Sequence, residues 1–214
     1  PLPSSPNLHV NCQNISFSYP GKSIFQQVDF NVGPKRIISI LGENGAGKTT
    51  FFKLLSQMLK PQTGEINFFL GQERLSAKKC FDAMSIIYQN SESQFYFDTV
   101  REELSFKASQ LELVMKLATL MGLDNTLDRS PYMLSEGQKR RLSILIAIAQ
   151  DKPLILYDEP TYGQDKENIT LITRLMMALK QANRLQIMIT HDRPWAQEIS
   201  DEIYQLDNQK LVRL

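Results

Sequence analysis

Hydrophobic and polar residues alternate along residues 8–32, which is the pattern of strands with one buried face. Pro20, Gly21 and Lys22 interrupt the alternation with residues that favour turns. The apolar positions on the two sides of this turn are Val10, Cys12, Ile15, Phe17, Ile24, Phe25, Val28, Phe30 and Val32. We therefore expect an antiparallel hairpin with Tyr19 at its tip.

Beyond the hairpin, short apolar runs without alternation predict strands that are buried on both faces. The predicted strands are residues 37–41, 65–70, 85–88, 154–157 and 185–190, followed by a closing hairpin of residues 202–206 and 210–212. Turns are expected at residues 61–64 and 71–72, and a loop at residues 90–98. Helical patterns separate most of the later runs, so we expect an α/β fold with a largely parallel sheet.

Helical periodicity accounts for most of the remaining chain. An apolar stripe with spacings of three and four begins after Val100, and Gly122 follows it where a C-cap glycine belongs. The stripe consists of Leu104, Leu111, Val114, Leu117, Leu120 and Met121. A second helix begins at Ser135, whose side chain fits a capping box with Gln138. These patterns predict a mostly helical lobe at about residues 91–150, and further helices at residues 50–59, 168–183 and 193–200.

Composition narrows the class of protein. The chain has 214 residues, 42% of them hydrophobic, and a net charge of +1, so no nucleic-acid partner is expected. Its two cysteines lack metal-type spacing and fit a reduced, cytosolic compartment. No apolar run approaches the roughly 20 residues that span a bilayer. Residues 1–7 are rich in proline and serine and are interpreted as a tail or linker before one domain of residues 8–214.

The segment Gly-Glu-Asn-Gly-Ala-Gly-Lys-Thr at residues 42–49 lies between a predicted strand and a predicted helix, which is the context of a phosphate-binding P-loop. Glycines let backbone N–H groups turn onto phosphate oxygens, and the helix N-terminus adds partial positive charge. Lys48 can reach the outer phosphates, and the Thr49 hydroxyl can ligate Mg²⁺. The alternative is a glycine-rich turn with a chance lysine, which the flanking strand and helix disfavour.

Further polar residues stand at the carboxyl ends of predicted strands, where parallel sheets bind ligands. Beside a P-loop, Asp158 would serve Mg²⁺ and Glu159 would orient or deprotonate the attacking water. His191 can hydrogen-bond a terminal phosphate or hold that water, and the Gln89 amide can meet Mg²⁺ and the water. Each residue also has an ordinary interpretation, namely a solvated turn, a surface histidine or a loop glutamine. Tyr19 either stacks on a base or packs within the hairpin.

These features together resemble the nucleotide-binding domain of the ATP-binding cassette (ABC) family, and the resemblance covers essentially the whole chain. Its markers, in order, are an A-loop aromatic (Tyr19), Walker A (42–49), a Q-loop glutamine (Gln89), a signature (134–138), Walker B (154–158) followed by Glu159, a D-loop aspartate (Asp165) and a switch histidine (His191). The resemblance implies a P-loop NTPase with a RecA-like parallel sheet core, an antiparallel β subdomain and a helical signature subdomain.

The resemblance also implies a head-to-tail dimer with a second ABC ATPase subunit, in which ATP lies between Walker A of one subunit and the signature of the other. The residues it assigns to ATP in the same chain are Tyr19, Asn44, Gly45, Ala46, Gly47, Lys48, Thr49 and Thr50. Those assigned in trans are Ser135, Gly137, Gln138 and Asp165. Those assigned to Mg²⁺ are Thr49, Gln89 and Asp158, and the catalytic residues are Glu159, His191 and Gln89. ATP would close the dimer, and hydrolysis would reopen it.

One position departs from the family pattern, because Glu136 replaces the first of two glycines in Leu-Ser-Gly-Gly-Gln. A carboxylate is favoured by the dipole at a helix N-terminus. It would be repelled by a triphosphate unless it points away, so the strength of the trans contact depends on its direction.

A finer resemblance is to the ATPase subunits of energy-coupling factor (ECF) importers. It rests on Tyr-Gln-Asn-Ser-Glu-Ser-Gln-Phe at residues 88–95, where Ser91 replaces a usual proline, and on Gly-Gln-Asp at residues 163–165. It implies an ATPase at the cytoplasmic face of the cell membrane that powers uptake of a vitamin or metal ion through a transmembrane coupling subunit. The alternatives are the ATPase of another ABC transporter class, including an exporter, and a non-transport ABC ATPase.

Phe95, Tyr96 and Phe97 form an aromatic trio beside the Q-loop. Two interpretations stay open for the trio. It either receives a helix of the coupling subunit, as an exposed apolar patch would, or packs the helical lobe.

Overall fold

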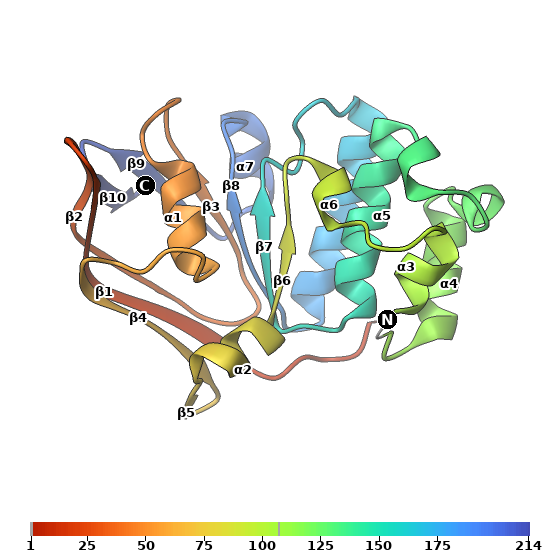
Figure 1. Ribbon diagram of the computed structural model, residues 1–214, viewed down its shortest axis with the longest axis horizontal. Helices are drawn as coiled ribbons and strands as arrows, with labels where there is room; N and C mark the ends of the chain where they lie inside the picture. The colour runs from red at the N-terminus through yellow and green to blue at the C-terminus, as the bar shows by residue number, and fades with distance from the viewer. Residues whose placement is uncertain (1, 107) are drawn as a thin grey trace.

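The computed structural model describes residues 2–106 and 108–214, which form two β-sheets with helices around them (Figure 1). An antiparallel sheet has the strand order β2-β1-β4-β5. A larger sheet has the order β10-β9-β3-β8-β7-β6, in which all neighbouring strands except β10 and β9 pair in parallel. The expected α/β architecture, with a parallel core and a separate antiparallel sheet, is confirmed.

The element bounds follow the predicted pattern closely in the sheets. The strands are β1 (Leu8–Tyr19), β2 (Lys22–Val32), β3 (Ile37–Leu41), β4 (Thr63–Leu70), β5 (Glu73–Arg74), β6 (Met84–Ile87), β7 (Leu154–Asp158), β8 (Leu185–Ile189), β9 (Glu202–Asp207) and β10 (Lys210–Arg213). The helices are α1 (Lys48–Leu55), α2 (Ala77–Asp82), α3 (Val100–Ser105), α4 (Leu111–Leu120), α5 (Glu136–Ala149), α6 (Lys166–Gln181) and α7 (Arg193–Ile199), with 3₁₀ turns η1 (Ser91–Gln94), η2 (Asp124–Thr126) and η3 (Pro131–Met133).

The parallel sheet separates two apolar cores, because successive residues of a strand point to opposite faces. Ile38 and Ile40 of β3 pack with α1 and the antiparallel sheet. Ile37 and Leu41 of the same strand pack with the helices on the opposite face. In Figure 1, α1 accordingly lies between the two sheets, while α5 and α6 lie on the other side of the parallel sheet. Burial on both faces explains why these strands appear in the sequence as continuous apolar runs.

Two predicted boundaries near the P-loop were wrong. Helix α1 ends at Leu55, not at residue 59, because Gln57 has a left-handed backbone conformation with φ of 59°. Strand β4 begins at Thr63 and so includes Gly64, which belongs to the predicted turn. A Cβ atom there would lie 2.3 Å from the carbonyl oxygens of Gln13 and Asn14. Gly64 therefore permits close approach to a bulge in β1, where the register between the strands shifts.

The helical lobe differs in detail from its predicted form. The single stripe after Val100 is divided between α3 and α4, and two of its members, Leu111 and Leu120, are exposed. Gly122 follows α4 with φ of 68°, as predicted for a C-cap glycine. Strand β5 and helix α2 were not predicted, since both are too short to show a period.

The segment before β1 packs against the connection between α6 and β8. The Ser5 N–H donates to the Ala182 carbonyl at 2.9 Å, and the buried Arg184 donates to the Pro3 carbonyl at 3.0 Å. Among the described residues, no helix combines the length and the apolar character needed to cross a membrane.

Candidate active site

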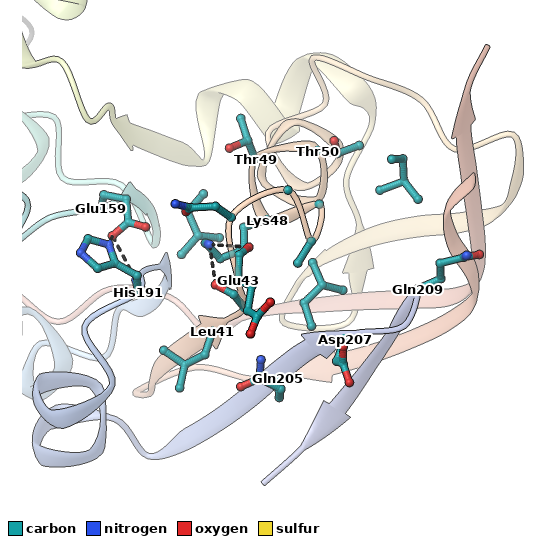
Figure 2. A pocket seen from close by; sticks show the side chains of 18 of the residues that line it. Leu41, Glu43, Lys48, Thr49, Thr50, Glu159, His191, Gln205, Asp207 and Gln209 are labelled. Carbon is teal, nitrogen blue, oxygen red and sulfur yellow. Dashed lines mark hydrogen bonds and ion pairs between the residues drawn. The ribbon is translucent and has the colours of Figure 1, made fainter. Parts of the chain in front are cut away.

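A pocket of about 1640 Å³ opens at the carboxyl ends of the parallel strands. It is larger than the roughly 300–1,000 Å³ of a typical small-molecule site. The loop of residues 42–50 after β3, Gln89 after β6, Asp158 and Glu159 at the end of β7, and His191 after β8 all line it. The four strand ends therefore meet, as expected from parallel pairing. Figure 2 shows the loop residues on one side of this pocket and the Glu159–His191 pair beside them.

The glycine loop adopts left-handed conformations that depend on its glycines. Gly45 and Gly47 have φ of 83° and 106°. A Cβ atom on Gly47 would lie 2.7 Å from Ile24 Cγ2, so this position also needs glycine for space. Helix α1 begins directly after it at Lys48, which points the first N–H groups of the helix toward the loop.

Lys48 is buried and lies across the loop, because its Nζ donates to the carbonyl oxygens of Gly42 at 2.6 Å and Glu43 at 3.1 Å (Figure 2). Thr49 is exposed to the pocket, whereas Thr50 is buried. The loop therefore presents a lysine, a hydroxyl and a helix N-terminus on one concave surface, which is the donor set that binds phosphate.

Asp158 is half-buried, and its pKa is raised by burial and by the neighbouring charge of Glu159. Arg140, Lys48 and Lys53 oppose this rise in pKa. A carboxylate in such surroundings gains from a nearby cation. Together with the Thr49 hydroxyl and the Gln89 amide oxygen, it makes an all-oxygen donor set, which fits Mg²⁺.

Glu159 and His191 form a pair. The Glu159 Oε2 atom accepts hydrogen bonds from the His191 N–H at 3.2 Å, and it lies 2.9 Å from His191 Nδ1. The side chain of Glu159 is nearly buried, whereas that of His191 is 57% exposed. With Nδ1 as the donor, the neutral imidazole keeps Nε2 as an acceptor. The Glu159 backbone has φ of 48°, a conformation that costs an L-residue about 1–2 kcal/mol.

The predicted trans residues lie elsewhere. Ser135 caps α5, where its Oγ accepts from the Gln138 N–H and its own N–H donates to Gln138 Oε1. Asp165 caps α6 and accepts from the Asn168 N–H at 2.8 Å. Within the part of the chain that the structure describes, Ser135, Gly137, Gln138 and Asp165 do not line the pocket with the glycine loop.

Sequence reasoning missed several residues at the site. Arg140 of α5 is 2% exposed and donates to two backbone carbonyls next to the pocket. In the sequence it is one of three adjacent basic residues, which is typical of a solvated helix face. The β9–β10 hairpin also lines the pocket through Gln205, Asp207 and Gln209 (Figure 2). No local signal predicts this, because it depends on β9 pairing with β3.

Two aromatic predictions left alternatives: the structure is compatible with both for Tyr19, and it narrows those for the trio of residues 95–97. Tyr19 is 40% exposed, lines the pocket and packs edge-on against Phe17. Of the trio, Phe95 is buried against Tyr132, and Phe97 packs against the ring of Phe106. Tyr96 is 82% exposed. Only Tyr96 of the trio is therefore available as an exposed ring.

Comparisons with a family model and with known proteins indicate the same family. A family model described as "ABC transporter" matches residues 25–162, which is more than half of the chain. The energy-coupling factor transporter ATP-binding protein EcfA of Aster yellows witches'-broom phytoplasma is 30% identical, covering 95% of this chain and 77% of that protein. EcfA1 of Mycoplasmoides gallisepticum is also 30% identical, covering 97% of this chain and 77% of that protein.

Some curated relatives are longer, since the chain spans 38% of one from Bacillus subtilis and 55% of one from Mycoplasma genitalium. Among solved structures, cbiO1 from Clostridium perfringens has a TM-score of 0.81 at 22% identity, with 95% of this chain and 86% of that chain covered. A bacterial Atm1-family ABC exporter with ATP bound has a TM-score of 0.81 at 24% identity, with 99% of this chain and 40% of that chain covered. At these identities the likeness shows the fold.

Proposed function

Because the chain belongs to the ABC transporter family of ATP-binding proteins, we propose that its pocket binds and hydrolyses ATP to power a membrane transporter. The observation that carries this proposal is the meeting of a phosphate-type loop with Asp158, Glu159 and His191 in one pocket. In the same pocket Glu159 pairs with His191, while Asp158 lies in the field of Arg140, Lys48 and Lys53.

We assign the roles of these residues from the family resemblance and from their places in the pocket. Lys48 and the amides at the start of α1 would bind the phosphates, and Tyr19 would contact the base. Thr49, Gln89 and Asp158 would hold Mg²⁺, which neutralises phosphate charge when bound. Glu159 would accept the proton of the attacking water, because its carboxylate is the one paired with His191. His191 would keep that carboxylate in place and orient it toward the attacking water.

The signature residues would complete the pocket of another subunit. Ser135, Gly137 and Gln138 lie at the N-terminus of α5, where a helix offers N–H groups to an anion. They lie outside the pocket of their own chain. Glu136 is 76% exposed and pairs with Lys139 at 3.0 Å, so part of its charge is balanced beside the helix. This placement supports a functional signature despite the departure from the family pattern.

The transporter class we favour is the ECF-type importer. The relatives named EcfA and EcfA1 support this choice, as does the sequence around Gln89 and Asp165. The chain would then act at the cytoplasmic face of the membrane with a second ATPase subunit and a transmembrane coupling subunit. The substrate, a vitamin or metal ion, would be selected by a membrane component. The same fold occurs in an exporter, so fold alone does not discriminate between transporter classes.

Two variants test the ATPase proposal. Lys48→Ala removes the lysine that we assign to the phosphates and is expected to weaken ATP binding. Glu159→Gln is expected to keep ATP binding and to lower turnover by about 10²–10⁴-fold, the usual contribution of a general base. Binding is measured by equilibrium titration with ATP, and turnover by phosphate release.

Glu198→Gln, an exposed substitution on α7, serves as the matched control and should leave both quantities unchanged. Unchanged turnover in Glu159→Gln would refute the assignment of the general base. Affinity purification from membranes tests the transport role, which predicts that a transmembrane subunit and an ATPase subunit copurify with the chain.

A further inference from the structure

We propose that Arg140 is a positioning residue for the hydrolysis reaction, which holds Gln89 by its backbone and ties it to helix α5. The inference rests on the proposed function, because it assigns Gln89 to the metal and the water. It adds a residue that touches neither of them. Its support comes from hydrogen bonds, burial and charge around one guanidinium.

The geometry of Arg140 is specific for two successive carbonyl groups. Its Nη1 donates to the Tyr88 carbonyl and its Nη2 donates to the Gln89 carbonyl, each at 2.6 Å. The planar guanidinium supplies two N–H donors in a fixed fork, which lysine cannot do. Because both acceptors are backbone atoms at the end of β6, Arg140 fixes where the chain leaves the sheet and therefore where the Gln89 side chain starts.

Packing alone does not explain a charge at this position. Arg140 is 2% exposed, and its Nε atom is buried without a hydrogen-bond partner. Burial lowers its pKa to about 10, while Asp158 and Glu136 favour the charged form, so the guanidinium is charged at neutral pH. A buried cation is costly unless it is hydrogen-bonded and faces opposite charge. The charge of Arg140 is stabilised by the two carbonyl groups and by the negative charge of Asp158.

A second contact joins the same two segments. Lys139, the preceding residue of α5, pairs with Glu92 in η1. Figure 1 shows α5 running beside η1 and the end of β6. Two successive residues of α5 thus hold residues 88–92. Since α5 begins at the signature capped by Ser135, a displacement of the signature helix would move Gln89 with it.

The test separates positioning from a general structural role by comparing two buried arginines. Arg184 is 1% exposed and also donates to backbone carbonyls, those of Pro3 and Ala182, but it does not line the pocket. It also pairs with Asp151. Arg140→Met should lower kcat about 10–100-fold, as expected for a misplaced catalytic group, and leave the KM for ATP nearly unchanged. Arg184→Met should lower the unfolding temperature without changing kcat.

A double-mutant cycle with Gln89→Ala identifies the residue through which Arg140 acts. If Arg140 works through Gln89, the double variant should be no slower than the slower single variant. Multiplicative losses in kcat would overturn the proposal. Turnover is measured with the full chain in its purified complex.

Hydrogen exchange gives a readout that does not need turnover. Arg140→Met should accelerate amide exchange at residues 89–94 but not in β8, and unchanged exchange at residues 89–94 would overturn the proposal. A wild-type complex without ATP turnover would instead refute the proposed function, while the exchange data would still decide whether Arg140 holds this segment.

Discussion

Two adjacent carboxylates, Asp158 and Glu159, lie at and just after the end of β7, in different surroundings. Asp158 faces the positive charges of Arg140, Lys48 and Lys53, and burial raises its pKa. Glu159 turns through a left-handed backbone conformation and meets His191. Adjacent acids in different surroundings commonly take different roles. The sequence alone suggests that Asp158 and Glu159 have different roles. The left-handed backbone conformation of Glu159 explains how its side chain reaches His191.

Glu103 is a buried acid outside the pocket. It is 3% exposed, and one carboxylate oxygen accepts from the N–H groups of Tyr96 and Phe97. Burial raises its pKa, while these backbone hydrogen bonds and the charge of Glu102 act in opposite directions on it. It links α3 to the segment that follows η1.

The raised pKa of Glu103 predicts a pH dependence of stability. Because the folded state holds this proton more tightly than the unfolded state, the free energy of unfolding falls as pH rises from the ordinary range of a glutamic acid through the raised value. Glu103→Gln should remove this part of the slope and keep the oxygen acceptor. Urea unfolding between pH 4 and pH 8 provides the measurement.

The exposed Glu198→Gln variant is the control and should unfold with the wild-type pH dependence. An identical slope in Glu103→Gln and wild type would show that Glu103 does not contribute to it.

At the scale of elements, helix α5 contributes to three regions: the signature, the segment after β6 and the apolar core. Its N-terminus carries the signature, its next turn carries Lys139 and Arg140, and its apolar residues lie in the core. The capping box and the buried positions of this helix could be predicted, because both depend on spacing along one helix. The role of Arg140 could not, because it depends on β6 lying beside α5.

Gly137 links α5 to α6. A Cβ atom at Gly137 would lie 2.4 Å from Asn168 Nδ2, which is too close without a shift of the amide. Because the obstructing atoms belong to the end of a side chain that can rotate, Gly137→Ala is expected to destabilise the protein by about 1 kcal/mol, at the low end of the usual cost of overpacking. Denaturant unfolding measures this change.

The matched background is Asn168→Ala, which removes the obstructing amide. There the same Gly137→Ala substitution should be neutral or stabilising, since alanine is the better helix former by up to about 1 kcal/mol. Equal effects of Gly137→Ala in both backgrounds would show that Asn168 is not the constraint.

At the scale of the whole molecule, the residues that we assign to ATP lie in two separate places. The P-loop, acids and histidine share one pocket, whereas Ser135 and Asp165 cap helices outside it. The parallel sheet and the strand-end residues could be predicted from apolar runs. The place of the C-terminal hairpin beside the pocket could not, because strand order is a property of the assembled sheet. This separation is why we infer a composite site completed by a second subunit.

The central claim is tested most directly by comparing Lys48→Ala with Lys48→Ala/Ser135→Arg, each in a dimer with a wild-type partner, whether a second copy or a copurifying ATPase subunit. The first change disables the P-loop of this chain only. We measure the nucleotide retained per dimer after rapid gel filtration. If Ser135 acts in trans, the single variant retains ATP at the facing P-loop and the double variant loses it. If both variants retained the same amount of nucleotide, Ser135 would not contribute to the facing P-loop, which would contradict the composite site.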